Sequence, residues 1–175
     1  SEMCIRDRDA LCGEISAGGE MVRRAGLRVR TFYMGGGTPT TLTAEQMDRV
    51  LTAFETSFDR TACEEITVEA GRPDTITAEK LAVLARRGCS RVSVNPQTMQ
   101  DAVLERMGRA HRADDILRAY ALAREVGFDS INMDLIAGLT GDTAETFAQT
   151  VDTLLNLSPE NITVHTLANK RGADL

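Results

Sequence analysis

Apolar positions along the chain follow two periods in turn. Short runs of apolar and β-branched residues predict five strands, at residues 29–33, 66–69, 91–94, 130–136 and 162–166. Apolar residues three and four positions apart predict helices, at residues 10–25, 47–58, 81–85, 101–107, 114–126 and 147–155. The recurring unit is therefore strand, loop, helix, loop, strand.

This order of elements predicts a parallel sheet, because helices that join strands running in the same direction form right-handed crossovers. Two α/β folds fit it: a β/α barrel, whole or partial, and a doubly wound sheet. Polar or glycine residues lie at or near the ends of four successive strands, at residues 35–38, Glu69, Gln97 and Asp134. Barrel enzymes build their sites on the carboxyl face of the strands. We therefore predict an α/β fold of parallel strands that forms a partial (β/α) barrel.

Several helix ends carry local signals. Thr43 and Gln46 have the spacing of a capping box, in which each side chain accepts a hydrogen bond from a free backbone amide. Asp142 and Glu145 predict a second capping arrangement before residues 147–155. Gly127 is expected to end the helix at residues 114–126.

Composition limits the class of protein. Hydrophobic residues make up 42% of the 175 residues, which suits a single globular domain with a sizeable core. A formal net charge of -6 argues against a nucleic-acid surface. No apolar run reaches the roughly 20 residues that cross a bilayer, so no membrane span is predicted.

The cysteines and the first residues carry no clear motif. Cysteines at positions 4, 12, 63 and 89 match the spacing of neither a zinc site nor a cluster, so we predict no metal site in this chain. We interpret them as free thiols in a reducing cytoplasm. Residues 1–8 follow no helix or strand period and are interpreted as a tag or artefact. Residues 9–175 then form one domain.

Three consecutive glycines, Gly35, Gly36 and Gly37, lie between a strand and an expected helix start. Unpaired amides at the mouth of a helix can cradle carboxylate or phosphate oxygens. The alternative is a tight turn, for which one glycine would suffice. The run matches neither a P-loop nor a dinucleotide fingerprint.

Four side chains are candidates for binding. Glu69 could accept paired hydrogen bonds from a ribose, or be a solvated strand end. Asp134 lies in an apolar run, where an unpaired charge is costly, so we expect a ligand or a buried donor beside it. Gln97 suits a ligand or the bracing of a loop. Arg109 suits a carboxylate, which a guanidinium pairs in a fork, or open solvent.

Four segments together carry a resemblance to a known family. They are YMGGGTPT (33–40), VEA (68–70), RVSVNPQT (91–98) and INMDLIAGL (131–139). They resemble the oxygen-independent coproporphyrinogen III oxidase family of radical S-adenosylmethionine (SAM) enzymes, and most of all its coproporphyrinogen dehydrogenase branch. The resemblance extends over nearly everything after Arg28 and implies the partial barrel that this family shares.

The resemblance also implies roles for individual residues. The glycine run from Gly35 would bind the methionine part of SAM through Gly36, Gly37 and Thr38, and Glu69 would hold a ribose. Gln97, Arg109 and Asp134 would line the same or a second SAM site, with Arg109 on a carboxylate. Ala168 would offer its backbone near the adenine.

The implied chemistry is reductive cleavage of SAM by a [4Fe-4S] cluster, followed by oxidative decarboxylation of propionate side chains. The implied partners are a tetrapyrrole substrate, coproporphyrinogen III, and an electron donor. The family's Cys-x-x-x-Cys-x-x-Cys motif should precede Arg28 and is absent. We therefore interpret the chain as an interior fragment, truncated at both ends, that alone binds no cluster and is inactive.

Two alternatives remain open. A haem chaperone of the same superfamily would share the GGGTPT element but deliver haem. A cofactorless β/α protein would use the glycines only as a turn.

Overall fold

The computed structural model of the protein describes residues 2–168, and the side chains of residues 7–168. One sheet contains five strands: β1 (Thr31–Met34), β2 (Glu65–Gly71), β3 (Arg91–Gln97), β4 (Ser130–Ala137) and β5 (Asn161–Thr166). The helices are α1 (Glu2–Arg24), α2 (Ala44–Ser57), α3 (Ala78–Arg86), α4 (Asp101–Arg106), α5 (Ala113–Val126) and α6 (Ala144–Leu157). Short 3₁₀ turns η1 (Pro39–Thr41), η2 (Arg60–Ala62) and η3 (Pro73–Thr75) fill three of the loops.

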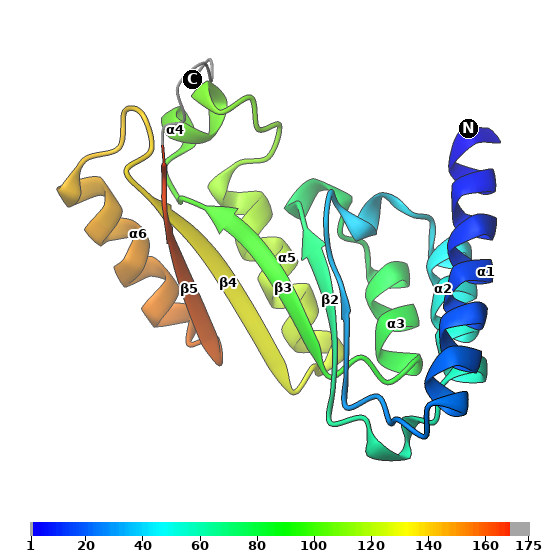
Figure 1. Ribbon diagram of the computed structural model, residues 1–175. Helices are drawn as coiled ribbons and strands as arrows, with labels where there is room; N and C mark the ends of the chain where they lie inside the picture. Colours follow the sequence, from blue (N-terminus) through cyan, green and yellow to red (C-terminus); the bar gives the residue numbers. More distant parts are fainter. Residues whose placement is uncertain (1, 169–175) are drawn as a thin grey trace.

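The strands lie in the order in which they occur in the chain, and every neighbouring pair is parallel. A doubly wound sheet would reverse direction at a switch point, whereas this sheet winds one way throughout. Figure 1 shows the resulting curved, open sheet with the helices along its outside. The prediction of a parallel α/β fold of the partial barrel type is confirmed.

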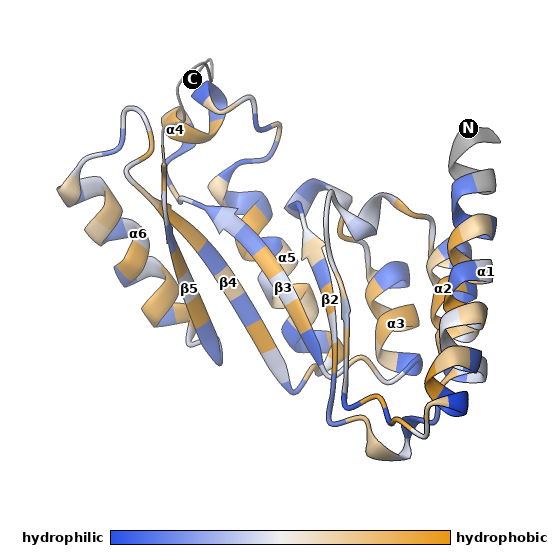
Figure 2. Cartoon of the chain, in the orientation of Figure 1, coloured by the Kyte–Doolittle hydropathy of each residue, from blue (hydrophilic) through white to orange (hydrophobic). Residues whose placement is uncertain are grey.

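The two faces of the sheet differ because side chains alternate along each strand. The pairing register aligns apolar positions on one face, where they meet the helices. The opposite face, here called the polar face, is built from Tyr33, Glu65, Thr67, Glu69, Arg91, Ser93, Asn132, Asp134, Asn161, Thr163 and His165. Figure 2 shows hydrophilic and hydrophobic residues alternating along β3 and β4.

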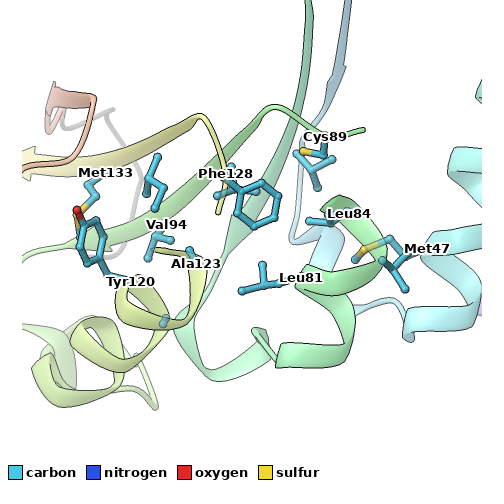
Figure 3. Packing of buried hydrophobic residues seen from close by; sticks show 14 of the residues in the cluster. Met47, Leu81, Leu84, Cys89, Val94, Tyr120, Ala123, Phe128 and Met133 are labelled. Atoms are coloured by element: carbon cyan, nitrogen blue, oxygen red, sulfur yellow. The ribbon is translucent and has the colours of Figure 1, made fainter. Parts of the chain in front are cut away.

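The core lies between the sheet and the helices. Met47 of α2 and Leu84 of α3 are fully buried, as are Val94 and Met133 of the sheet. In Figure 3, Met133 and Val94 lie beside Tyr120 and Ala123 of α5. Each such side chain contributes about 1.5 to 3 kcal/mol on burial, so the helix face of the sheet holds the fold together.

Three of the predicted helix signals can be compared with the structure. The capping box of Thr43 and Gln46 is confirmed by hydrogen bonds of 3.2 and 2.9 Å. The capping arrangement of Asp142 and Glu145 is wrong by one position, because the capping box of α6 joins Thr143 to Thr146. Asp142 instead accepts a hydrogen bond from the Thr143 amide at 3.1 Å. Gly127 ends α5 in the left-handed conformation that its role predicts.

The first helix is longer than the sequence pattern predicted. It begins at Glu2 instead of residue 10, although residues 2–8 show no helical period in the sequence. No glycine or proline interrupts residues 2–12, so a helix can extend through them. Asp9 also pairs with Arg49 of α2 at 3.1 Å. The interpretation of residues 1–8 as a tag or artefact stays a prediction. No helix in the described part of the chain combines the length and apolar character of a bilayer crossing.

Two glycines of α1 allow a matched test of how α1 packs on α2. A Cβ at Gly19 would lie 2.8 Å from the Cβ of Ser57 and closer still to the Ser57 backbone oxygen, whereas a Cβ at Gly13 meets nothing within 4 Å. We expect Gly19→Ala to lower the free energy of unfolding by about 1 to 3 kcal/mol through overpacking. Gly13→Ala should raise it by up to about 1 kcal/mol through helix propensity. Urea denaturation measures both, and equal effects would contradict the packing of α1 on α2.

Candidate functional site

The candidate residues gather at one edge of the sheet. The strands are parallel, so the loops after β1 and β5 and the last residues of β2, β3 and β4 all lie at the carboxyl edge. Figure 1 shows this edge at the arrowheads of the strands. The topology alone therefore brings to one edge residues that are up to 133 positions apart in sequence, from Gly35 to Ala168.

Glu69 is joined directly to the glycine loop, defined here as residues 35–38. One oxygen of Glu69 accepts a hydrogen bond from the Tyr33 hydroxyl, and the other accepts one from the Gly36 amide at 3.2 Å. A Cβ at Gly35 would lie 3.1 Å from the Glu69 carboxyl carbon and would collide with the Tyr33 ring. Glycine at position 35 therefore allows the contact between Tyr33 and Glu69.

The next two glycines turn the chain. Gly36 and Gly37 have φ angles of 77° and 57°, a left-handed pair that residues with a Cβ rarely adopt. Nothing lies within 4 Å of the position of a Cβ at either residue, so the loop is open on that side. The prediction that these amides sit at a helix mouth is wrong, because only the three-residue turn η1 follows Thr38 and α2 starts at Ala44. The helix dipole therefore does not act on this loop, and the Gly36 amide instead binds Glu69.

Buried hydrogen bonds anchor the far end of the glycine loop. Thr40 is fully buried, and its hydroxyl lies 2.5 Å from the carbonyl oxygen of Ala70, the neighbour of Glu69. Lys80 of α3 donates to the carbonyl oxygens of Thr40 and Thr75, at 2.5 and 3.0 Å. The loop is therefore fixed to β2 and α3 and holds its position relative to Glu69.

Asp134 lies on the polar face, two strands away from Glu69. Its Oδ1 accepts a hydrogen bond of 2.6 Å from the side-chain amide of Asn132. Of the two expectations for this residue, a ligand or a buried donor, the structure contains the donor. The charge of Asp134 also acts on the phenol of Tyr33, as does that of Glu69. Two carboxylates therefore face the space beside the glycine loop.

Gln97 and Ala168 also lie at the carboxyl edge. Gln97 ends β3 with a φ of 69°, at an irregular point in its pairing with β4. Its Oε1 is buried, and no residue of the described chain gives it a hydrogen bond. Ala168 is exposed and follows β5, one residue after the Leu167 amide donates to the Ala137 carbonyl oxygen. Their roles at a ligand stay predictions.

Arg109 belongs to a second, charged group in the loops after β2 and α4. Burial, followed by the positive charge of Arg72, lowers the pKa of Arg109, and Asp74 opposes this shift. Arg72 pairs with Asp74 at 3.3 Å. The ring of His111 is buried, with Nδ1 3.7 Å from Asp74, and burial lowers its pKa. Arg109 is therefore half-buried beside Asp74, whereas sequence reasoning left a solvated surface position open.

Sequence reasoning missed two residues that orient the site. Tyr33 holds Glu69, and Asn132 holds Asp134. Both occupy polar positions in alternation with apolar ones, such as Asn132 between Ile131 and Met133. The alternation was the available signal, and it becomes specific once the strands are aligned side by side.

The described residues do not fit an iron–sulfur cluster. Among residues 7–168, whose side chains the structure describes, no three His, Cys, Asp or Glu side chains lie close enough together to hold a metal ion. Cys12 of α1, Cys63 in the loop before β2 and Cys89 in the loop before β3 are free thiols. Burial raises the pKa of Cys89 to about 12, so it is not a ready thiolate ligand.

Known proteins resemble the chain over most of its length. The Radical SAM superfamily model matches residues 14–154. The oxygen-independent coproporphyrinogen-III oxidase-like protein HemZ of Bacillus subtilis is 45% identical over 158 residues, which cover 90% of this chain and 32% of that protein. The haem chaperone HemW of the same organism is 38% identical over 143 residues, which cover 79% of this chain and 37% of that protein.

A solved structure has a similar fold. Coproporphyrinogen III oxidase HemN from Escherichia coli, described as a radical SAM enzyme, superposes with a TM-score of 0.83 at 32% identity. The match covers 93% of this chain and 37% of that one. The chain thus spans about a third of the length of these relatives.

The contact between Tyr33 and Glu69 can be tested by titration. Partial burial, the hydrogen bond to Glu69 and the charges of Glu69 and Asp134 raise the pKa of Tyr33 to about 12. The residue is 61% exposed, so we rest the prediction on the hydrogen bond. The folded chain keeps a proton that the unfolded chain releases, so the free energy of unfolding should fall as pH rises from about 10 to about 12.

Carbon NMR of tyrosine labelled at Cζ measures this directly, and Tyr33→Phe assigns the signal, since the chain has two tyrosines. Glu69→Gln should move the Tyr33 pKa down toward its ordinary value of about 10. A Tyr33 signal that titrates at the same pH in wild type and in Glu69→Gln would disprove the contact.

Proposed function

Because the chain belongs to the radical SAM superfamily, we propose that its carboxyl edge binds S-adenosylmethionine. The observation that carries this proposal is the attachment of Glu69 to the glycine loop through Tyr33 and the Gly36 amide. A carboxylate can accept about four hydrogen bonds, and two are in use. The remaining positions suit the paired hydroxyls of a ribose.

The charges around the loop suit the same ligand. SAM carries a sulfonium cation, and the carboxylates of Glu69 and Asp134 both act on the space beside Tyr33. Gly36 and Gly37 leave room for the methionine part, and Thr38 follows them with its side chain outside any helix cap. Arg109 supplies a positive charge for a carboxylate at the same edge of the sheet. Gln97 and Ala168 would complete the site from β3 and β5.

Radical SAM proteins combine SAM with a [4Fe-4S] cluster, and together these supply radical chemistry to the superfamily. The described residues of this chain offer no ligands for the cluster, so we assign them no step in electron transfer. Their proposed part is to bind SAM, to orient it through Glu69 and Asp134, and to form one wall of the substrate cavity.

The family of this chain is haem-related, and we propose the activity of its oxidase members for the whole protein. The substrate is then coproporphyrinogen III, which is converted to protoporphyrinogen IX without oxygen by decarboxylation of two propionate side chains. Each decarboxylation removes two electrons from the substrate: one leaves with the hydrogen atom that the 5'-deoxyadenosyl group of SAM takes up, and the second passes to an electron acceptor. An external donor supplies the electron that cleaves SAM, and we place the reaction in the cytoplasm. The 45% identity to HemZ supports this choice. The alternative is haem delivery, because HemW is 38% identical over much of the same region.

The SAM site can be tested by calorimetry on this chain. Glu69→Gln removes the charge that two ribose hydroxyls would bind, so we expect the affinity for SAM to fall about tenfold or more. Glu65→Gln is the matched control, because Glu65 lies on the same face of the same strand but at its amino end. The affinity of the Glu65→Gln variant for SAM should stay within about twofold of wild type. Equal weak heats from wild type and Glu69→Gln would instead support a cofactorless protein with a glycine turn.

Oxidase and chaperone can be separated on the protein extended to the length of its relatives. We expect it, with its cluster reconstituted anaerobically, to form protoporphyrinogen IX and to bind haem weakly. Porphyrin fluorescence after oxidation measures the product, and Soret absorbance measures haem binding. Stoichiometric, tight haem binding without turnover would favour the chaperone. The 175-residue chain alone serves as the negative control and should take up no cluster.

A further inference from the structure

Asn132 lies at the centre of a hydrogen-bond network that connects three strands. Its Nδ2 donates to Ser93 of β3 at 3.2 Å and to Oδ1 of Asp134 at 2.6 Å. Its Oδ1 accepts from Thr163 of β5 at 2.9 Å and from the side-chain amide of Asn161. We infer that Asn132 is a positioning residue for SAM binding, because it fixes the carboxylate of Asp134 toward the site. This inference rests on the proposed function.

The orientation of the Asn132 amide follows from its neighbours. An ionised carboxylate can only accept hydrogen bonds, so the end of Asn132 that faces Asp134 must be the NH₂ group. The oxygen end then faces β5, where Thr163 and Asn161 supply donors. The β5 side is compatible with this orientation, and a flipped amide would lose the Asp134 bond.

Asn132 also has no hydrogen-bonding capacity left over. A side-chain amide has two donors and two acceptor positions, and all four are used here. The residue is 3% exposed, so these bonds are made out of contact with water. Losing one of these buried hydrogen bonds would cost more free energy than losing one at the surface. The four bonds therefore hold the Asn132 side chain in one position.

Asn132 binds only one of the two carboxylate oxygens of Asp134. Among the described residues, the side-chain hydrogen bond to Asp134 engages Oδ1 and leaves Oδ2 for a ligand. Asn132 thereby holds the carboxylate in one rotamer before the ligand arrives, which reduces the ordering cost of binding. Ligand contact stays with Asp134, and Asn132 acts through it.

The substitution Asn132→Asp tests this role without changing the size of the side chain. It places a second carboxyl against Asp134, and two facing carboxylates repel unless they share a proton. The protonated form restores a donor toward Asp134 and so imitates Asn132. We therefore expect SAM affinity to fall about tenfold or more at pH 8 and to recover toward wild type near pH 5.

The comparison is made as the ratio of variant to wild type at each pH, by calorimetry with SAM. This ratio cancels the titration of the ligand and of the other ionisable groups on the polar face, which are Tyr33, Glu65, Glu69, Arg91 and His165. Ser93→Ala is the matched control, because it removes the other acceptor of the same NH₂ group and leaves the Asp134 bond intact. It should change the affinity less than about twofold at every pH.

The outcomes separate the inference from the proposed function. A pH-dependent loss in Asn132→Asp, with thermal melting that shows a folded variant, supports the positioning role. A loss that is independent of pH, or one that Ser93→Ala reproduces, overturns it and leaves a structural role only. Wild-type binding that Glu69→Gln does not weaken would overturn the proposed function first, and the inference with it.

Discussion

The structure depends on the burial of one face of the sheet. Val68, Val92 and Met133 lie on neighbouring strands and are fully covered by the helices. Side chains alternate along a strand, so burying these positions directs every second residue to the opposite face. A slip of one residue in any strand would exchange the two faces. The same hydrophobic interaction that stabilises the fold therefore also arranges the polar face.

Many side chains of the polar face form hydrogen bonds and ion pairs with one another. Asn132 alone connects β3, β4 and β5, and at the other end of the sheet Arg91 lies 3.7 Å from Glu65. Buried polar groups are costly unless they are paired, so such a face is stable only when its members satisfy each other. The network supplies that pairing and leaves Glu69 and Asp134 at the edge where the glycine loop lies.

Close contact explains the glycine loop better than a helix dipole does. A helix start after three glycines is a reasonable expectation, but α2 begins six residues after Thr38 and has its own cap. What the glycines provide is room: at Gly35 for the pair of Tyr33 and Glu69, and at Gly36 and Gly37 for a left-handed turn. The glycine loop and the Glu69 carboxylate are therefore joined directly, through Tyr33 and the Gly36 amide.

Much of this protein follows from its sequence alone. The order of strands and helices, the capping box at Thr43 and the position of Glu69 near the end of β2, which continues to Gly71, are local properties. Periodicity and capping depend on residues a few positions apart. The need of Asp134 for a partner is also visible locally, because this charged residue lies in an apolar run of the sequence. Polar residues at the ends of successive strands also predicted the barrel fold.

Only the tertiary structure decided which residues meet. That Tyr33 reaches Glu69, and that Asn132 holds Asp134 between Ser93 and Thr163, depends on the register between strands up to 39 residues apart. The structure also shows α6 capped at Thr143 instead of Asp142, and α1 starting at Glu2. Local sequence limits the choice of conformations, but the contacts between distant segments select one of them.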